Sequence, residues 1–210
     1  MAVATVQIQF IQYQTSQSIK ITKFIDNSIM DSTASSIIDI LLQVEGGYNA
    51  GLDGGTYCGL TWKWCNDWSG WSTVKSSNLK NGETLSSLTD SVKNYYYDNH
   101  YTRLKCGSIS CVMISGQLLC YGVHHGENNA VKDLQTAINE VAGENAVKVD
   151  GSIGNGTLAY LNNEAYMTKI ASKFVARIKA YYDTCTEYKD GFLNRLSTVT
   201  SGLTTLQSTL

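Results

Sequence analysis

The sequence lacks several features that mark particular classes of protein. It contains no proline, and its 16 Lys and Arg residues nearly balance 18 Asp and Glu residues, for a formal net charge of −2. A chain this close to neutrality offers no positive field to a nucleic acid, so no nucleic-acid partner is expected. No apolar run approaches the roughly 18 residues that a membrane-spanning helix requires, so no membrane insertion is expected. The first ten residues, MAVATVQIQF, have neither the basic region nor the compact apolar core of a Sec-type signal peptide.

The cysteines and histidines do not form a recognisable metal-binding pattern. No two of the six cysteines have CxxC spacing, and no histidine stands beside them at the spacing of zinc ligands. We expect most of them to be small buried hydrophobic residues in a reduced compartment, with Cys106–Cys111 or Cys58–Cys65 disulfides as the alternative in an oxidising one. The side chains of the adjacent pair His124 and His125 diverge, and no third ligand is near in sequence. No metal site is predicted.

The composition is that of a folded domain. Hydrophobic residues make up 43% of the 210 residues and charged residues 16%, which suffices for a sizeable core and argues against disorder. This length fits one domain of moderate size, or a catalytic core with appended segments.

The stretch from 44 to 61, VEGGYNAGLDGGTYCGLT, is the most informative part of the chain. Apolar residues dominate the segment 35–44, which predicts a short buried helix with Ser35 or Ser36 as its N-cap. Gly46 is suited to end that helix, so Glu45 falls in its last turn. The negative end of the helix dipole and an apolar wall both favour a protonated carboxyl, as a general acid requires. The alternative is a helix that simply ends in glutamate before a glycine.

The same stretch resembles the signature of glycoside hydrolase family 108. The resemblance rests on Glu-Gly-Gly-Tyr at 45–48, followed by Asp53, Gly54, Gly55, Thr56, Gly59, Leu60 and Thr61. The sequence departs from the family pattern by a shorter loop between Tyr48 and Gly54 and by a missing residue before Thr56. Members of this family are phage and bacterial muramidases, so the resemblance implies a lysozyme-like α+β fold that is mostly α-helical, here with a short N-terminal β segment.

The resemblance also implies site residues and a reaction. Glu45 would protonate the leaving oxygen of a glycosidic bond in peptidoglycan, while Asp53 stabilises the oxocarbenium-like sugar or, with Thr56, positions water. No metal or organic cofactor is needed for this reaction. Contacts with the substrate are expected from Gly47, Tyr48, Gly55, Trp62, Trp64 and His124.

Tryptophan is concentrated directly after the signature. Trp62, Trp64, Trp68 and Trp71 are all four tryptophans of the chain. Exposed aromatic rings stack on sugar faces, whereas most tryptophans in proteins are core residues. We expect that not all four are buried. His124-His125-Gly126 falls where the family has a turn, so His124 is expected at a turn or at the edge of the cleft.

The second half of the chain is predicted to be helical. The segment 85–104 and the apolar segment 109–123 are predicted as helices, and 73–82 as a linker. Residues 130–158 resemble the peptidoglycan-binding-like segment of the family, although a helix–turn–helix connector without ligand contacts is the better explanation for most of them. The segment 166–189 has helical spacing, and Gly191–Arg195 (GFLNR) resembles the closing element of the family.

Both ends of the chain fall outside the family pattern. Alternating residues predict strands at 3–13 and 18–25, so residues 1–34 form an N-terminal β extension, which either packs on the domain or docks on a partner. The muramidase domain is expected at 35–196, with peptidoglycan-binding-like helices at 128–196. Leucines at heptad-like spacing make 197–210 an amphipathic tail that packs on its own domain or on a partner. These two ends suggest a phage-associated enzyme bound to other virion (tail) proteins, present in the virion or host cytoplasm before release and acting in the periplasm or cell wall.

Three alternatives to a muramidase remain open. A lytic transglycosylase would use Glu45 without a water-positioning Asp53 and would leave an anhydro end. A structural or wall-binding virion protein could retain the fold without activity. A cysteine peptidase built on Cys58 or Cys120 with His124 lacks a recognisable motif.

Overall fold

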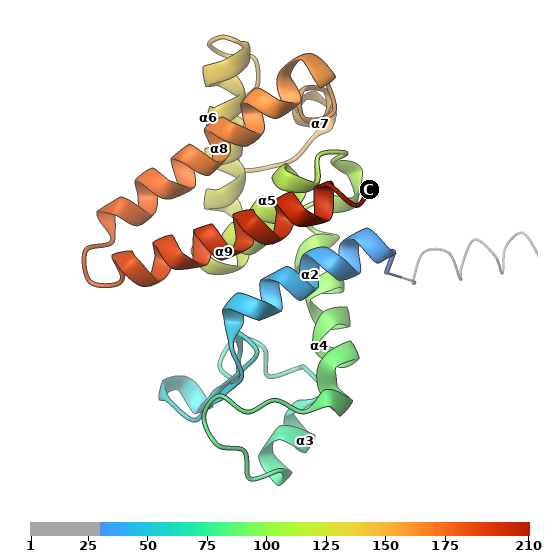
Figure 1. The fold of residues 1–210 in the computed structure, drawn as a ribbon, viewed down its shortest axis with the longest axis vertical. Coiled ribbons are helices and arrows are strands. Elements are labelled where there is room, and N and C mark those ends of the chain that lie inside the picture. Colours follow the sequence, from blue (N-terminus) through green and yellow to red (C-terminus); the bar gives the residue numbers. More distant parts are fainter. Residues whose placement is uncertain (1–29) are drawn as a thin grey trace, which may run out of the picture. The chain divides into compact units, whose positions relative to one another are not determined.

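The computed structural model describes residues 30–210, so the strands expected at 3–13 and 18–25 lie outside the described residues. The longer helices, from Ser32 to Leu210, belong to one compact unit (Figure 1). These helices are α2 (Ser32–Glu45), α4 (Thr89–Tyr96), α5 (Val112–His125), α6 (Glu127–Ala142), α8 (Glu164–Thr184) and α9 (Lys189–Gln207), with the short helices α3 (Trp71–Ser76) and α7 (Asn155–Leu161).

Helix α2 ends where the sequence predicted and begins three residues earlier, at Ser32 instead of Ser35. Its buried face consists of Ala34, Ile37, Ile38, Ile40 and Leu41. Gly46 has φ of +72°, a left-handed conformation that a residue with a side chain adopts only at a cost, and the helix stops before it. Glu45 is therefore the last helical residue.

A small antiparallel sheet follows α2 directly. It has the order β1 (Tyr48–Asn49), β2 (Thr56–Tyr57) and β3 (Leu60–Thr61). Tyr48 pairs with Tyr57, and Thr56 pairs with Thr61. The turn between β1 and β2 is left-handed at Asp53, Gly54 and Gly55. The glycine-rich signature thus folds as a hairpin whose tip carries Asp53.

Helix α5 is the centre of the helical part. Ten of the eleven residues at positions 112–122 are buried, and α2, α6, α8 and α9 all pack against this helix. Its Gly116 gives room to a neighbour, because a Cβ there would collide with the side chain of Leu203 on α9. In Figure 1, α9 crosses the ribbon beside α5 and α2, which brings the last helix of the chain next to the helix that carries Glu45.

The loop between α6 and α7 is held from within by two amide side chains. Buried Gln135 accepts hydrogen bonds from the backbone N–H groups of Asp150 and Gly151 and donates to Asp150 Oδ1 and the Ser152 carbonyl. Asn139 bonds both backbone groups of Val147. Gln135 and Asn139 thus hold the turn of this segment in place.

Three expectations about elements need correction. The segment 73–82 is not linker throughout, because α3 extends to Ser76. The helix expected at 85–104 is divided into a 3₁₀ turn at Ser86–Leu88, α4, and a π-helical turn at Tyr97–Tyr101. The boundary expected between residues 196 and 197 falls inside α9, whose Leu196, Val199 and Leu203 are all buried.

The predicted fold class is confirmed: the described chain is an α+β protein, mostly α-helical, with one small sheet. All six cysteines are free, and four of them are buried. Within residues 30–210, no helix is long and apolar enough to cross a membrane.

Candidate active site

Glu45 lies in an ion pair with Arg195 at the junction of α2 and the sheet. Arg195 Nη2 donates to Glu45 Oε1 at 2.5 Å, and the two side chains are only 11% and 14% exposed. Sequence reasoning noted Arg195 in a closing element but assigned it no role. The pair joins residues 150 positions apart, so neither periodicity nor local spacing could have revealed it.

Arg195 connects three helices at this point. Besides Glu45, it donates to the carbonyl of Val44 on α2 at 3.1 Å and to the carbonyl of Cys120 on α5 at 3.3 Å. Burial opposes the charge of Arg195, but the Glu45 carboxylate outweighs it and raises the pKa of the guanidinium. The guanidinium thus satisfies the C-terminal end of α2 while it orients the carboxylate that follows.

The second carboxylate oxygen of Glu45 faces the sheet. A Cβ placed on Gly59 would lie 2.5 Å from Oε2, so Oε2 is directly beside the turn between β2 and β3. Tyr96 from α4 reaches the same turn, where its hydroxyl donates to the Cys58 carbonyl at 2.8 Å. Among the described residues, Oε2 has no hydrogen-bond partner, so Arg195 fixes one oxygen and leaves the other available.

The sequence placed Glu45 at the end of a helix beside an apolar wall but gave it no cationic partner. That partner could not be foreseen, because Arg195 comes from α9.

Asp53 and Thr56 lie on the hairpin, away from direct contact with Glu45. Asp53 is exposed and pairs with Lys63 at 3.0 Å, both side chains being about half exposed. Thr56 is half-buried in β2, opposite Asn49 and Thr61. No contact joins either residue to Glu45 among the described residues, so their proposed catalytic roles stay predictions.

The glycines expected to contact substrate also have structural reasons to be glycine. A Cβ on Gly47 would collide with the backbone of Gly82 and Glu83, which lies against this strand. A Cβ on Gly55 would lie 3.3 Å from the Asn49 carbonyl and 3.7 Å from the Tyr48 ring. Gly55 is buried and Tyr48 half-buried, so this part of the hairpin is closely packed.

The four tryptophans separate into two groups, as expected. Trp68 and Trp71 are 4% and 3% exposed and pack edge to face. Trp64 is 75% exposed, and Trp62 is half-buried beneath the Lys75 ammonium, 3.2 Å from the ring centroid. The two tryptophans predicted to contact substrate are therefore the two that reach the surface.

His124 lies near the Glu45–Arg195 pair, at the end of α5. Its ring packs edge to face on Phe192 at 4.5 Å, and its Nδ1 shares a 3.1 Å hydrogen bond with the Tyr182 hydroxyl. Burial, assisted by the Arg195 charge, lowers the pKa of His124 to about 4. His124 is therefore neutral at physiological pH and lines a pocket that Arg195 also lines.

The environment of the cysteines disfavours a cysteine peptidase. Burial raises the pKa of Cys58 to about 11 and that of Cys120 to about 12, so neither thiol is ionised near neutral pH. A catalytic cysteine needs the opposite shift, since the thiolate is the nucleophile. Within residues 30–210, no group of three or more His, Cys, Asp or Glu side chains is placed to bind a metal ion.

Comparisons with known proteins agree with this geometry. Residues 38–126 match the family described as glycosyl hydrolase 108. The fold is similar to the structure of Brucella abortus SagA, with a TM-score of 0.59 and 22% sequence identity, over 82% of this chain and 94% of that chain. No curated protein sequence matches. The predicted resemblance is confirmed: the matched residues 38–126 include Glu45, Asp53 and Thr56, and the chain has a lysozyme-like fold.

Proposed function

We propose that this protein is a peptidoglycan hydrolase, a muramidase that cleaves the glycan backbone with Glu45 as the general acid. The observation that carries the proposal is the asymmetric position of the Glu45 carboxyl in the glycosyl hydrolase 108 region. Its Oε1 is bound by Arg195, while Oε2 faces the sheet without a hydrogen bond from the described residues. Because a guanidinium at Oε1 opposes protonation there, a proton on this carboxyl belongs on Oε2.

Cleavage then follows the chemistry of two carboxyl groups. Oε2 of Glu45 gives its proton to the glycosidic oxygen as the bond breaks and the sugar becomes oxocarbenium-like. The Asp53 carboxylate stabilises that positive charge, or acts with Thr56 on the water that completes the hydrolysis. Asp53 pairs with Lys63 and is about half exposed, so its carboxylate can turn toward substrate.

Delivery by a phage particle is part of the same proposal. It is supported by the residues outside the matched region, namely 1–37 and 127–210. The C-terminal segment supports docking less than expected, because residues 197–207 belong to α9 and bury Val199 and Leu203 within the domain. Docking on other virion proteins is therefore assigned to residues 1–34.

The test is digestion of purified peptidoglycan by the wild type and Glu45→Gln, with products identified by mass spectrometry. Glu144→Gln is the matched control, because Glu144 is exposed in the loop after α6. We expect reducing muramic-acid ends from the wild type and the control, and none from Glu45→Gln. Anhydro ends would instead identify a lytic transglycosylase, and wall binding without any product would indicate a structural protein.

The role of Asp53 can be separated from that of its ion pair. Asp53→Asn removes the charge, whereas Lys63→Met removes the partner and leaves the carboxylate in place. If Asp53 stabilises the charged sugar, Asp53→Asn loses most of the activity and Lys63→Met retains it. Equal losses in the two variants would mean that only the ion pair matters, and the catalytic role of Asp53 would have to be abandoned.

A further inference from the structure

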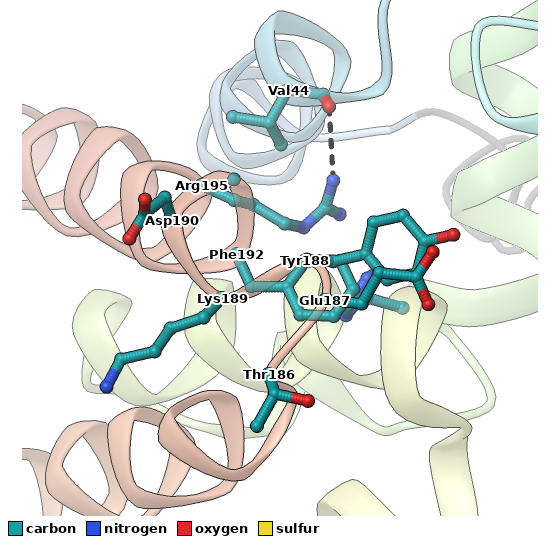
Figure 2. A pocket seen from close by; sticks show the side chains of 10 residues that line it. Val44, Thr186, Glu187, Tyr188, Lys189, Asp190, Phe192 and Arg195 are labelled. Atoms are coloured by element: carbon teal, nitrogen blue, oxygen red, sulfur yellow. Dashed lines mark hydrogen bonds between the residues drawn. The ribbon is translucent and has the colours of Figure 1, made fainter.

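A pocket of about 550 Å³ lies between the end of α2 and the turn that joins α8 to α9. We call it the α8–α9 pocket. The residues that line it include Arg195, His124, Glu187, Tyr188, Asp190 and Phe192. Figure 2 shows Val44 and Arg195 joined by their hydrogen bond on one side, with Glu187 and Tyr188 on the turn across from them. Its volume is within the range of roughly 300–1,000 Å³ that small-molecule sites occupy.

The pocket adjoins the candidate acid through two residues. Arg195 lines the pocket and donates to Glu45 Oε1, and Val44, the residue before Glu45, lines it too. The Arg195 side chain therefore lies between this space and the Glu45 carboxyl group.

The charges of the pocket exclude a strongly anionic occupant. Arg195 is occupied by Glu45, and Lys189 pairs with Asp183 at 2.9 Å. The carboxylates of Glu187 and Asp190 are exposed and have no ion-pair partner among the described residues. The pocket thus offers two carboxylates that can accept hydrogen bonds, and both of its cations are already paired. Such a lining suits a neutral ligand that donates hydrogen bonds, such as a sugar with free hydroxyl groups.

An aromatic wall completes the pocket. Phe192 packs on His124, and Tyr188 packs on Phe192 with ring centroids 5.9 Å apart. Tyr188 is nevertheless 60% exposed, so one face of its ring is available to a ligand. A ring that is supported on one side and exposed on the other is suited to stack on the apolar face of a sugar.

We propose that the α8–α9 pocket is a subsite for one neutral sugar ring of the glycan, of the N-acetylhexosamine class. Tyr188 stacks on the ring, and Glu187 and Asp190 accept hydrogen bonds from its hydroxyl groups. This inference rests on the proposed function, since it extends the cleft that serves Glu45. It differs from a stem-peptide site, because a peptide with free carboxylates would meet Glu187 and Asp190 as like charges.

Binding is best measured in the Glu45→Gln protein, so that turnover does not consume the probe. The probe is a linear tetramer of N-acetylglucosamine, followed by isothermal titration calorimetry. Adding Tyr188→Ala should weaken binding about fivefold to tenfold, the effect of one lost aromatic contact. Glu187→Gln should weaken it less, because an amide oxygen still accepts a hydrogen bond. The same variants in the active protein should raise KM more than they lower kcat.

Tyr166→Ala is the matched control. Tyr166 lies near the start of α8, roughly 27 Å along the helix from its end at 1.5 Å per residue, and packs on Tyr160. We expect this variant to bind the tetramer like its parent. Thermal unfolding of both tyrosine variants verifies that they fold.

Three results would overturn the subsite. They are absence of tetramer binding by the parent, equal binding by folded Tyr188→Ala, and displacement of the tetramer by a sugar-free stem peptide. These outcomes are independent of the proposed acid, which is tested by the activity of Glu45→Gln. If Glu45→Gln keeps its activity while Tyr188→Ala binds the tetramer more weakly, Glu45 is not the general acid but the α8–α9 pocket is still a sugar subsite.

Discussion

Arg195 Nη2 lies 2.5 Å from Glu45 Oε1, so the last helix of the chain orients the carboxyl group at the end of the first described helix. The same guanidinium bonds the carbonyls of Val44 and Cys120. One residue thus links α2, α5 and α9 at the point where the proposed reaction occurs. We therefore expect Arg195 to affect stability and catalysis in ways that can be measured separately.

Removing Arg195 should destabilise the fold and lower activity. Arg195→Met leaves a largely buried carboxylate without its cation, which costs about 3–5 kcal/mol in unfolding free energy. Arg195 also orients the Glu45 carboxyl group, so kcat should fall even where the variant is folded. Urea unfolding and kcat measured below the unfolding transition test the two effects.

Arg103→Met is the control, because Arg103 pairs with Glu127 while its own side chain is 68% exposed. This variant should change neither the free energy of unfolding nor kcat appreciably. A double variant, Arg195→Met with Glu45→Gln, should be more stable than Arg195→Met alone, since no unpaired charge is left buried. If the double variant is as unstable as the sum of the two single ones, the pair is not coupled.

His124 should make the protein less stable in mild acid. Its pKa falls from an ordinary 6.5 to about 4 in the folded state because the ring is buried beside Arg195. Below pH 6.5 the unfolded chain binds a proton that the folded chain does not bind until near pH 4. Stability is therefore complete above pH 6.5 and declines as the pH falls toward 4. His124→Gln removes this contribution, so its Tm should fall less than that of the wild type between pH 7 and 5. An identical fall would show that His124 does not titrate on unfolding.

Local features of the fold could be predicted from the sequence, because their causes are local. Gly46 ends α2 as predicted, since a left-handed residue after an apolar helix is a short-range signal. Trp62 and Trp64 were predicted as substrate contacts, and they are the two tryptophans that reach the surface. Burial of the other two depends on tertiary contacts that the sequence does not give, such as the bond from Trp68 Nε1 to Ser91 on α4.

The parts of the site that were missed depend on contacts across the whole chain. Arg195 reaches Glu45 only because α9 packs along α2 and α5, and the sequence gives no distance between residues 45 and 195. The same packing explains why residues 197–207 are not a separate tail. A heptad-like leucine stripe predicts an apolar face, but the surface that covers it is decided by tertiary structure, here by Ile40 against Gly202 and by Gly116 against Leu203.

Gly59→Ala should reduce activity more than its backbone conformation alone explains. Gly59 has φ of +81°, where a Cβ costs about 1–2 kcal/mol. Its Cβ would also collide with the Tyr96 hydroxyl and lie 2.5 Å from Glu45 Oε2, so both side chains must move. Gly82→Ala isolates the backbone effect, because Gly82 has φ of +89° and nothing within 4 Å of the added carbon. Gly59→Ala should lose more stability than Gly82→Ala because of the Tyr96 collision, and among folded protein only Gly59→Ala should lose most of its turnover. Equal turnover in the two would argue against Oε2 as the reacting atom.

Leu203 should matter to the domain as a core residue, not as a docking residue. Its side chain is fully buried in the space left by Gly116, so Leu203→Ala creates a cavity and should cost about 2–5 kcal/mol in unfolding free energy. Leu210→Ala, at a position that is 72% exposed, is the matched control and should unfold like the wild type. Because α9 also carries Arg195, partial fraying of this helix would release Glu45 and lower activity at temperatures below the unfolding transition. Urea unfolding together with activity against temperature tests both consequences. If Leu203→Ala unfolds at the wild-type midpoint, then α9 does not contribute to the core, and the tail must be assigned to a partner after all.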